Sequence, residues 1–216
     1  MTVAVIDYHR DRDRWQSSAR GGLAQAALRL YAKQGYEQTT VTEIARLAGL
    51  TERMFVRNFA HKREVLFYGT EMAQGHLVRS VANAPASATP MDAVSAALET
   101  VGGIFQENPE CVRLRDAVVS ANAELREREL IKLAGFAIAV AGALRDCGVP
   151  EPATSLTAET RLAVFKVAVA RWVLRSCQPD LPGILREAME ELRGVLANRA
   201  PRDHNRAARQ AARLGK

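Results

Sequence analysis

Residues 39–62 carry two short amphipathic helical patterns separated by a glycine, and this pairing constrains the fold more than any other feature of the 216-residue chain. The apolar residues of the first pattern recur at the i, i+3, i+4, i+7 spacing of a helix, and they are Val41, Ile44, Ala45 and Ala48. Gly49 follows, and glycine ends a helix in the left-handed conformation without steric cost. The sequence therefore predicts a short helix, a tight turn and a second helix.

Threonines stand where both predicted helices begin. Thr40 can cap the first helix, and Glu43, three residues later, completes a capping box. Thr51 stands in the equivalent place before the second helix. Both helix starts are therefore specified locally by side chains that can bond the free backbone N–H groups.

The second helix has an apolar side and a basic side. Phe55 and Phe59, four residues apart, are predicted to face inward, whereas Arg53 and Arg57 share an outward stripe. Guanidinium groups on such a stripe can reach guanine edges in the DNA major groove. An arginine pair on an isolated helix is mostly a solvated face. Here it follows a capped helix and a glycine turn, which favours a DNA-reading helix-turn-helix.

From about Arg20 to Gly69 the sequence resembles the N-terminal domain of TetR-family transcriptional regulators. The elements that carry the resemblance stand in the family's order: a first-helix face of Leu23, Ala26, Ala27, Leu30 and Tyr31, then Gly35-Tyr36, Thr39-Thr40 and the run from Phe59 to Leu66. The resemblance implies an all-α protein of about nine helices. It would have an N-terminal three-helix helix-turn-helix domain and a C-terminal helical bundle.

The resemblance also implies which residues meet DNA. Thr40 and Lys62 match positions that hold phosphates at the starts of the second and fourth helices, where free N–H groups favour anions. The alternatives are a plain helix cap for Thr40 and an ordinary exposed lysine for Lys62. The other positions that match DNA-facing positions of the family are Thr42, Thr51, Glu52, Arg53, Met54, Arg57 and Asn58.

Three positions depart from the family pattern. Val56 replaces a common aromatic residue, Asn58 a histidine or tyrosine, and Arg53 a glycine. Val56 cannot donate a hydrogen bond, so affinity for the DNA backbone must come more from the basic residues of the domain. The run from Arg53 to Phe59 resembles a subgroup of the family that is associated with mycofactocin gene clusters.

The formal net charge of +6 is unevenly distributed. Residues 1–64 carry 11 basic and 7 acidic groups, residues 198–216 carry 6 and 1, and the segment between them carries 13 and 16. This asymmetry favours a polyanion as partner of the N-terminal module and predicts salt-sensitive binding. A non-specific architectural DNA-binding protein is the alternative, although it would not need an arginine stripe on a capped helix.

Composition and breaks divide the chain into four expected segments. Residues 1–17 would form a flexible arm, 18–66 the helix-turn-helix domain, 67–197 a ligand-binding and dimerisation domain, and 198–216 a basic disordered tail. Beyond Gly69 the pattern is helical throughout. The expected helices are 71–82, 91–107, one from Pro109, 124–147, 157–177 and one from about Pro182 to Ala197.

The helix expected over 157–177 is apolar on more than one side, which predicts that it buries several faces. With the apolar stripe of the last helix (Ile184, Leu185, Ala188, Leu192, Val195, Leu196), it resembles the family's two-helix contribution to a dimer bundle. A homodimer would read a palindromic operator in double-stranded DNA. The alternative is a core formed within one chain.

The resemblance further implies a pocket for a small effector within the bundle, lined by residues such as Phe105, Phe136 and Trp172. The alternative is that these aromatic residues are simply core. The few charges expected in the interior of this domain favour an apolar effector, and the mycofactocin-associated subgroup would point to acyl-CoA-like molecules.

An enzyme is not expected. The four histidines are scattered, and the motifs HExxH and GxSxG and a phosphate-binding loop are lacking, so neither catalysis nor metal or cofactor binding is predicted. Cys111, Cys147 and Cys177 lack a CxxC spacing and are expected to be reduced, buried thiols. With no predicted membrane span or signal peptide, we expect a soluble cytoplasmic regulator, most simply a repressor released by its effector.

Overall fold

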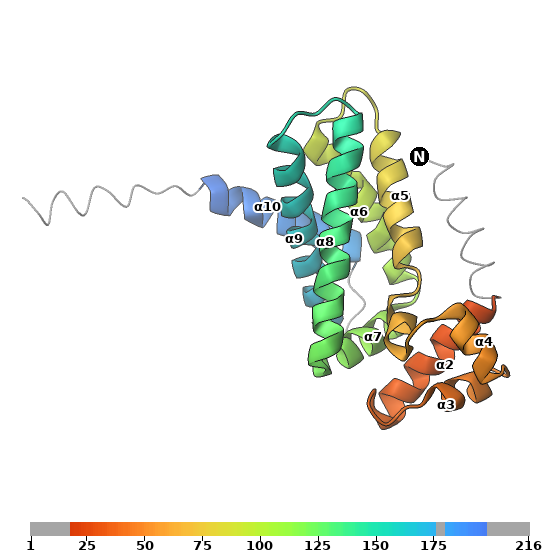
Figure 1. Ribbon diagram of the computed structural model, residues 1–216. Helices are drawn as coiled ribbons and strands as arrows, with labels where there is room; N and C mark the ends of the chain where they lie inside the picture. The colour runs from red at the N-terminus through yellow and green to blue at the C-terminus, as the bar shows by residue number, and fades with distance from the viewer. Residues whose placement is uncertain (1–17, 176–179, 198–216) are drawn as a thin grey trace, which may run out of the picture.

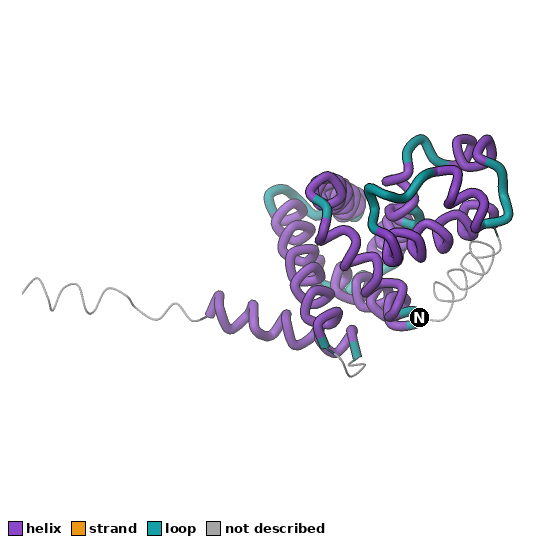
Figure 2. Tube along the Cα trace, turned by 90° about the horizontal axis from the view of Figure 1, so that it is seen from below, coloured by secondary structure: helices purple, strands orange, loops and turns teal. Residues whose placement is uncertain are grey.

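The computed structural model describes residues 18–175 and 180–197, which form only helices, turns and loops (Figure 1; Figure 2). The elements are α2 (Ala19–Gln34), α3 (Val41–Leu47), α4 (Glu52–Asn58), the 3-10 helix η1 (Lys62–Phe67), α5 (Thr70–Ala82), α6 (Pro90–Gln106), α7 (Pro109–Ala121), α8 (Ala123–Asp146), α9 (Ala153–Leu174) and α10 (Leu181–Ala197). The described part of the chain thus contains nine α-helices, and the all-α prediction is confirmed.

Helices α2, α3 and α4 form a small N-terminal domain at the lower right of Figure 1. Its core is made by buried side chains from each helix, with Leu23 and Tyr31 from α2, Ile44 from α3 and Phe55 from α4. The residues that the sequence pattern assigned to the inner faces are therefore the ones that pack together. This core fixes the angle between α3 and α4.

The remaining helices form a bundle in which α5, α6, α8, α9 and α10 pack against their neighbours, while α7 crosses beneath them (Figure 1). Buried aliphatic residues such as Val94, Val140 and Leu144 fill the space between α6, α8 and their neighbours. Trp172 of α9 and Ile184 of α10 belong to a second buried cluster. The bundle therefore has its own core.

Helix η1 joins the two parts of the molecule and is held by α7 and α8. Glu64 pairs with Arg128 of α8 at 2.9 Å, and Arg63 pairs with Glu124 of the same helix. Arg115 of α7 donates from Nε to the Leu66 carbonyl oxygen at 3.1 Å. The N-terminal domain is thus tied to the bundle by side chains from two bundle helices.

The expected helix boundaries agree with the structure to within a few residues, with one larger difference. The helix expected from residue 157 begins at Ala153, directly after Pro152, and its additional first turn buries Thr154. The expected arm at 1–17 and tail at 198–216 lie outside the described residues.

The expectation of buried thiols is wrong for Cys147. This residue is exposed because it caps the end of α8, at the turn to Gly148. Cys111 is half-buried, and burial raises the pKa of its thiol. Cys177 lies outside the described residues.

The apolar stripe of the last helix is divided between two environments. Ile184, Leu185 and Ala188 are buried within the chain, whereas Val195 and Leu196 are exposed. The first half of α10 therefore completes the core of its own chain, because it packs against α6 and α9. Only the C-terminal half of the stripe remains exposed and could contact another subunit.

Candidate DNA-binding site

Both ends of α3 are fixed by local hydrogen bonds. Thr40 Oγ1 accepts from the Glu43 backbone N–H at 3.2 Å, and Glu43 Oε2 accepts from the Thr40 backbone N–H at 2.9 Å. At the other end of α3, the Leu50 N–H donates to the Ala45 carbonyl at 2.9 Å, and Gly49 has φ of +68°. The predicted capping box and glycine turn are both present.

A side-chain hydrogen bond crosses the turn. The Thr42 hydroxyl donates to Glu52 Oε2 at 2.7 Å, which joins the start of α3 to the start of α4. The Thr51 hydroxyl oxygen accepts from the Met54 N–H at 3.3 Å and caps α4. Two of the predicted DNA-facing residues, Thr42 and Glu52, are therefore hydrogen-bonded to each other. The sequence spacing of ten residues gave no signal for this contact.

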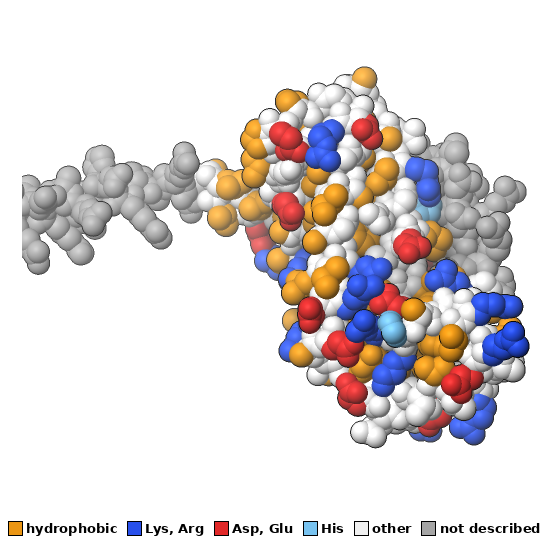
Figure 3. Space-filling view, viewed as in Figure 1, with side chains coloured by type: hydrophobic (Ala, Val, Ile, Leu, Met, Phe, Trp, Pro, Cys, Tyr) orange, Lys and Arg blue, Asp and Glu red, His pale blue; other side chains and the backbone are white. Residues whose placement is uncertain are grey.

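Helix α4 presents a basic outer face. Arg53 and Arg57 are exposed, whereas Phe55 and Phe59 are buried and pack against each other at 5.6 Å between ring centroids. Figure 3 shows Lys and Arg side chains along the edge of the molecule where α4 lies in Figure 1. Two buried rings thus anchor a helix whose opposite side offers two guanidinium groups to a ligand.

The predicted residues Met54 and Asn58 flank this face, together with Val56, which departs from the family pattern. Val56 stands where the family commonly has an aromatic residue. Its apolar side chain is 62% exposed to solvent. Met54 is half-buried, and the Asn58 amide donates to the Met54 carbonyl oxygen at 2.6 Å. One of the two Asn58 amide N–H groups is therefore engaged within its own helix, while the other N–H and the side-chain oxygen remain for other contacts.

Lys62 lies in a different environment from an ordinary surface lysine. Its ammonium donates to the carbonyl oxygens of Tyr36 at 2.9 Å, Glu37 at 3.2 Å and Thr39 at 3.2 Å. It also lies 4.4 Å from the centroid of the Tyr36 ring. An ammonium has three N–H donors, so these contacts can satisfy all of them. A phosphate contact by Lys62 stays a prediction. The role of Lys62 in holding the loop before α3 could not be seen in the sequence.

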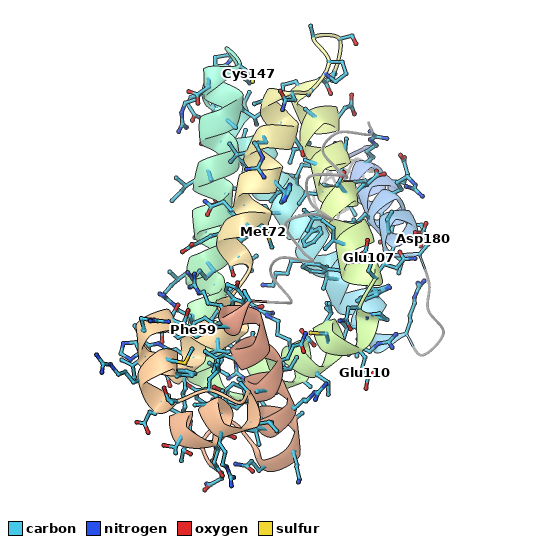
Figure 4. The ribbon with its side chains drawn as sticks, turned by 90° about the vertical axis from the view of Figure 1, so that its right-hand side faces the viewer. Phe59, Met72, Glu107, Glu110, Cys147 and Asp180 are labelled. Carbon is cyan, nitrogen blue, oxygen red and sulfur yellow. The ribbon has the colours of Figure 1, made fainter. Side chains whose placement is uncertain are left out.

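A cavity of about 550 Å³ lies beside the site, where the N-terminal domain meets the bundle. Phe59 of the N-terminal domain and Met72 of α5, both labelled in Figure 4, line it. The Arg20 guanidinium lies over the Phe59 and Tyr68 rings, at 5.1 Å and 4.8 Å from their centroids. These cation–π contacts hold the start of α2 against the end of the helix-turn-helix.

The three aromatic residues predicted to line an effector pocket lie in the cores of the bundle. Trp172 is buried, with the Arg113 guanidinium 5.7 Å from its ring centroid. Phe105 meets Phe165 edge to face at 5.8 Å, and Phe136 is partly buried. The cavity at the domain junction is lined by other residues. A pocket at these aromatic residues stays a prediction.

No cluster of three or more potential metal ligands occurs among the described residues. None of the described helices is both long and apolar enough to cross a membrane. The chemistry offered by the described N-terminal domain is that of hydrogen bonding and positive charge on an exposed helix.

A capped helix, a glycine turn and a second helix with an exposed arginine stripe define a helix-turn-helix domain of the DNA-binding class. The sequence model of the bacterial regulatory proteins of the tetR family matches residues 23–68. This match lies within the helix-turn-helix domain and agrees with the resemblance seen in the sequence from Arg20 to Gly69.

A curated relative is similar to part of the chain, and two solved structures share its fold. The chain is 35% identical over 92 residues to the HTH-type transcriptional regulator TcmR of Streptomyces glaucescens, a match that spans 43% of this chain and 41% of TcmR. The fold is similar to that of the fatty acid degradation regulator FadR from Bacillus halodurans, with a TM-score of 0.58, 18% identity and coverage of 81% and 94% of the two chains. It is also similar to Thermus thermophilus FadR in complex with lauroyl-CoA, with a TM-score of 0.54, 20% identity and coverage of 84% and 97%.

Proposed function

We propose that the protein is a sequence-specific, ligand-responsive transcriptional repressor that binds a palindromic operator as a homodimer in the cytoplasm. The observation that carries this proposal is the exposed pair Arg53 and Arg57 on α4, anchored from behind by Phe55 and Phe59. Arginine can bond the O6 and N7 atoms of guanine with two N–H groups, which suits major-groove reading.

The neighbouring polar residues would fix the position of α4 on the duplex. Thr40 and Thr51 lie at helix starts, where backbone N–H groups and hydroxyls can hold phosphates. Thr42, Glu52, Met54 and Asn58 would flank the bases or the backbone. Lys62 would act mainly by holding the loop that presents Thr40, since its ammonium already bonds three carbonyl oxygens of that loop.

The dimer would form through the outer faces of α9 and α10. On α9, Leu156, Val167 and Leu174 are exposed, and on α10 Val195 and Leu196 are exposed. Exposed apolar side chains on neighbouring helices are typical of a protein interface. A two-fold axis would place two α4 helices in half-sites about 34 Å, or a multiple of it, apart. In this arrangement residues 18–66 read DNA and 67–197 bind effector and partner.

The effector would be a small apolar or acyl-CoA-like molecule held in the bundle near Phe105, Phe136 and Trp172. Support comes from the fold, which is similar to that of a FadR bound to lauroyl-CoA. The run from Arg53 to Phe59 also resembles the mycofactocin-associated subgroup. Movement of α7 or α8 would reach the DNA-reading domain through η1, and so change the distance between the two α4 helices.

A footprint on the DNA upstream of the protein's own gene tests the proposal, at two salt concentrations and with non-specific competitor. Protection of one palindromic stretch is the expected result. Uniform, salt-labile protection would instead indicate a non-specific architectural protein, because phosphate contacts alone carry no sequence information. Absence of binding under both conditions would contradict the proposal.

A further inference from the structure

Arg161, on the inner side of α9, is a buried guanidinium. The residue is 3% exposed, and its Nε and Nη1 atoms have no hydrogen-bond partner among the described residues. Burying a charged donor without a partner is strongly unfavourable. A group of this kind requires an explanation, and a ligand that accepts its hydrogen bonds would supply the missing partners.

Arg161 lines a crevice of about 200 Å³ where α6, α9 and α10 meet. Figure 4 shows α10 beside α6, with α9 behind them. The volume is below the roughly 300–1,000 Å³ of pockets for drug-sized ligands, so the crevice suits a smaller molecule. Its apolar lining is formed by Leu98, Val164, Leu185 and Met189.

The other charged side chains around the crevice already have partners. Glu99 pairs with Arg186 at 2.9 Å, Glu190 pairs with Arg193 at 2.5 Å, and Asp92 accepts from the Thr89 hydroxyl at 2.6 Å. Burial, and next the charge of Arg193, lowers the pKa of Arg161, although a guanidinium stays protonated in proteins. Among these lining charges, Arg161 is the one with buried N–H groups left for a ligand.

We propose that this crevice binds a small carboxylate with a short apolar tail. The carboxylate would accept hydrogen bonds from Arg161, and the tail would lie against Val164 of α9 and Leu98 of α6. A guanidinium and a carboxylate form strong, charge-assisted hydrogen bonds. The carboxylates of Asp92, Glu99 and Glu190 also line the crevice, and they repel a dianion such as phosphate more strongly than a monocarboxylate.

The crevice differs from the effector pocket proposed within the bundle, since Phe105, Phe136 and Trp172 do not line it. Its occupation by a ligand can be measured in the absence of an operator. The test can therefore be made on the whole chain without DNA, and its outcome does not depend on whether an operator is found.

Isothermal titration calorimetry with hexanoate, and with hexan-1-ol as its neutral counterpart, provides the test. The wild-type protein is expected to bind hexanoate saturably and at least about tenfold more tightly than hexan-1-ol. Arg161→Met should weaken hexanoate binding about tenfold or more. Arg29→Met, which replaces an exposed arginine of α2, is the matched control and should leave it unchanged.

A second variant keeps the test decisive if Arg161→Met does not fold. Ser95→Phe would fill the crevice from α6 without altering the guanidinium, and should also abolish hexanoate binding. Without ligand, Arg161→Met is expected to melt at the same temperature as wild type or higher, because an unpaired buried charge is removed. The proposal is wrong if folded wild-type protein does not bind hexanoate saturably, or if wild type and both crevice variants bind it equally.

Discussion

The Lys62 ammonium lies 3.2 Å from the carbonyl oxygen of Thr39, the residue directly before the Thr40 helix cap. Replacing Lys62 by methionine removes this bond and those to Tyr36 and Glu37. We expect the free energy of unfolding to fall by about 1–3 kcal/mol, as for hydrogen bonds made by charged groups. Urea denaturation followed by circular dichroism would measure the change.

Lys33→Met is the matched control for Lys62, because Lys33 is an exposed lysine in the last turn of α2. It should leave the urea midpoint unchanged. If Lys62→Met also leaves the midpoint unchanged but lowers the salt dependence of DNA binding by about one ion, its ammonium contacts phosphate instead.

Arg53→Ala and Arg57→Ala are each expected to weaken operator binding by about 1–3 kcal/mol, because each loses a contact to a base edge. Binding to a scrambled duplex of equal length should change much less. Titrations with both duplexes, followed by fluorescence anisotropy, would show the difference, and Arg29→Ala serves as the control. Undiminished operator affinity in both variants would rule out α4 as the reading helix.

The Thr42–Glu52 hydrogen bond can be measured by a double-mutant cycle with Thr42→Val and Glu52→Gln. Because the bond is exposed, we expect a coupling free energy of roughly 0.5–1.5 kcal/mol in stability. Glu52→Gln should also raise affinity for any duplex, since it removes a negative charge from the DNA-facing surface. Additive effects of the two substitutions on stability would show that the bond does not form in solution.

The capping box makes the stability of the DNA-reading domain sensitive to acid. Bonds from the Thr40 backbone N–H, the Thr40 hydroxyl and Gln34 lower the pKa of Glu43 below its ordinary value of 4.5. Because the folded pKa is the lower one, the stabilisation is complete above about pH 4.5 and is lost as pH falls through the folded pKa. Wild type should therefore exceed Glu43→Gln in thermal stability at pH 7 and lose that advantage in acid. A constant difference across this pH range would contradict the role of the ionised carboxylate.

Leu174→Glu should separate the proposed dimer without unfolding the chain, because Leu174 is 84% exposed on α9. Sedimentation velocity at micromolar concentration would show monomer, and operator affinity would fall with it. Ile138→Glu, on the exposed side of α8, is the control and should remain dimeric. A dimer that persists in Leu174→Glu would place the interface elsewhere.

The helix-turn-helix could be predicted from the sequence because its determinants are local. The Thr40 cap, Glu43 and Gly49 act within a few residues, and the spacing of Phe55 and Phe59 alone assigns the inner side of α4. Helical periodicity likewise located the bundle helices to within a few residues.

The roles of Lys62 and Arg161 could not be predicted in the same way, because both depend on residues distant in the chain. Lys62 bonds carbonyl oxygens 23 to 26 residues away. Arg161 meets α6 and α10 in the crevice. The position of Arg161 between Ala158 and Leu162, on the inner face of α9, was the available signal that this charge would be buried.

Two bundle helices hold η1. Glu64 pairs with Arg128 of α8, and Arg115 of α7 donates to the Leu66 carbonyl oxygen. Because both helices hold η1, this connection resists bending. The DNA-reading domain would therefore rotate together with α8 as one rigid body. Lys62, in the first turn of η1, would carry the same rotation into the loop before α3. Small tilts inside the bundle would then be enlarged with distance from it, and the largest displacement would fall on Arg53 and Arg57.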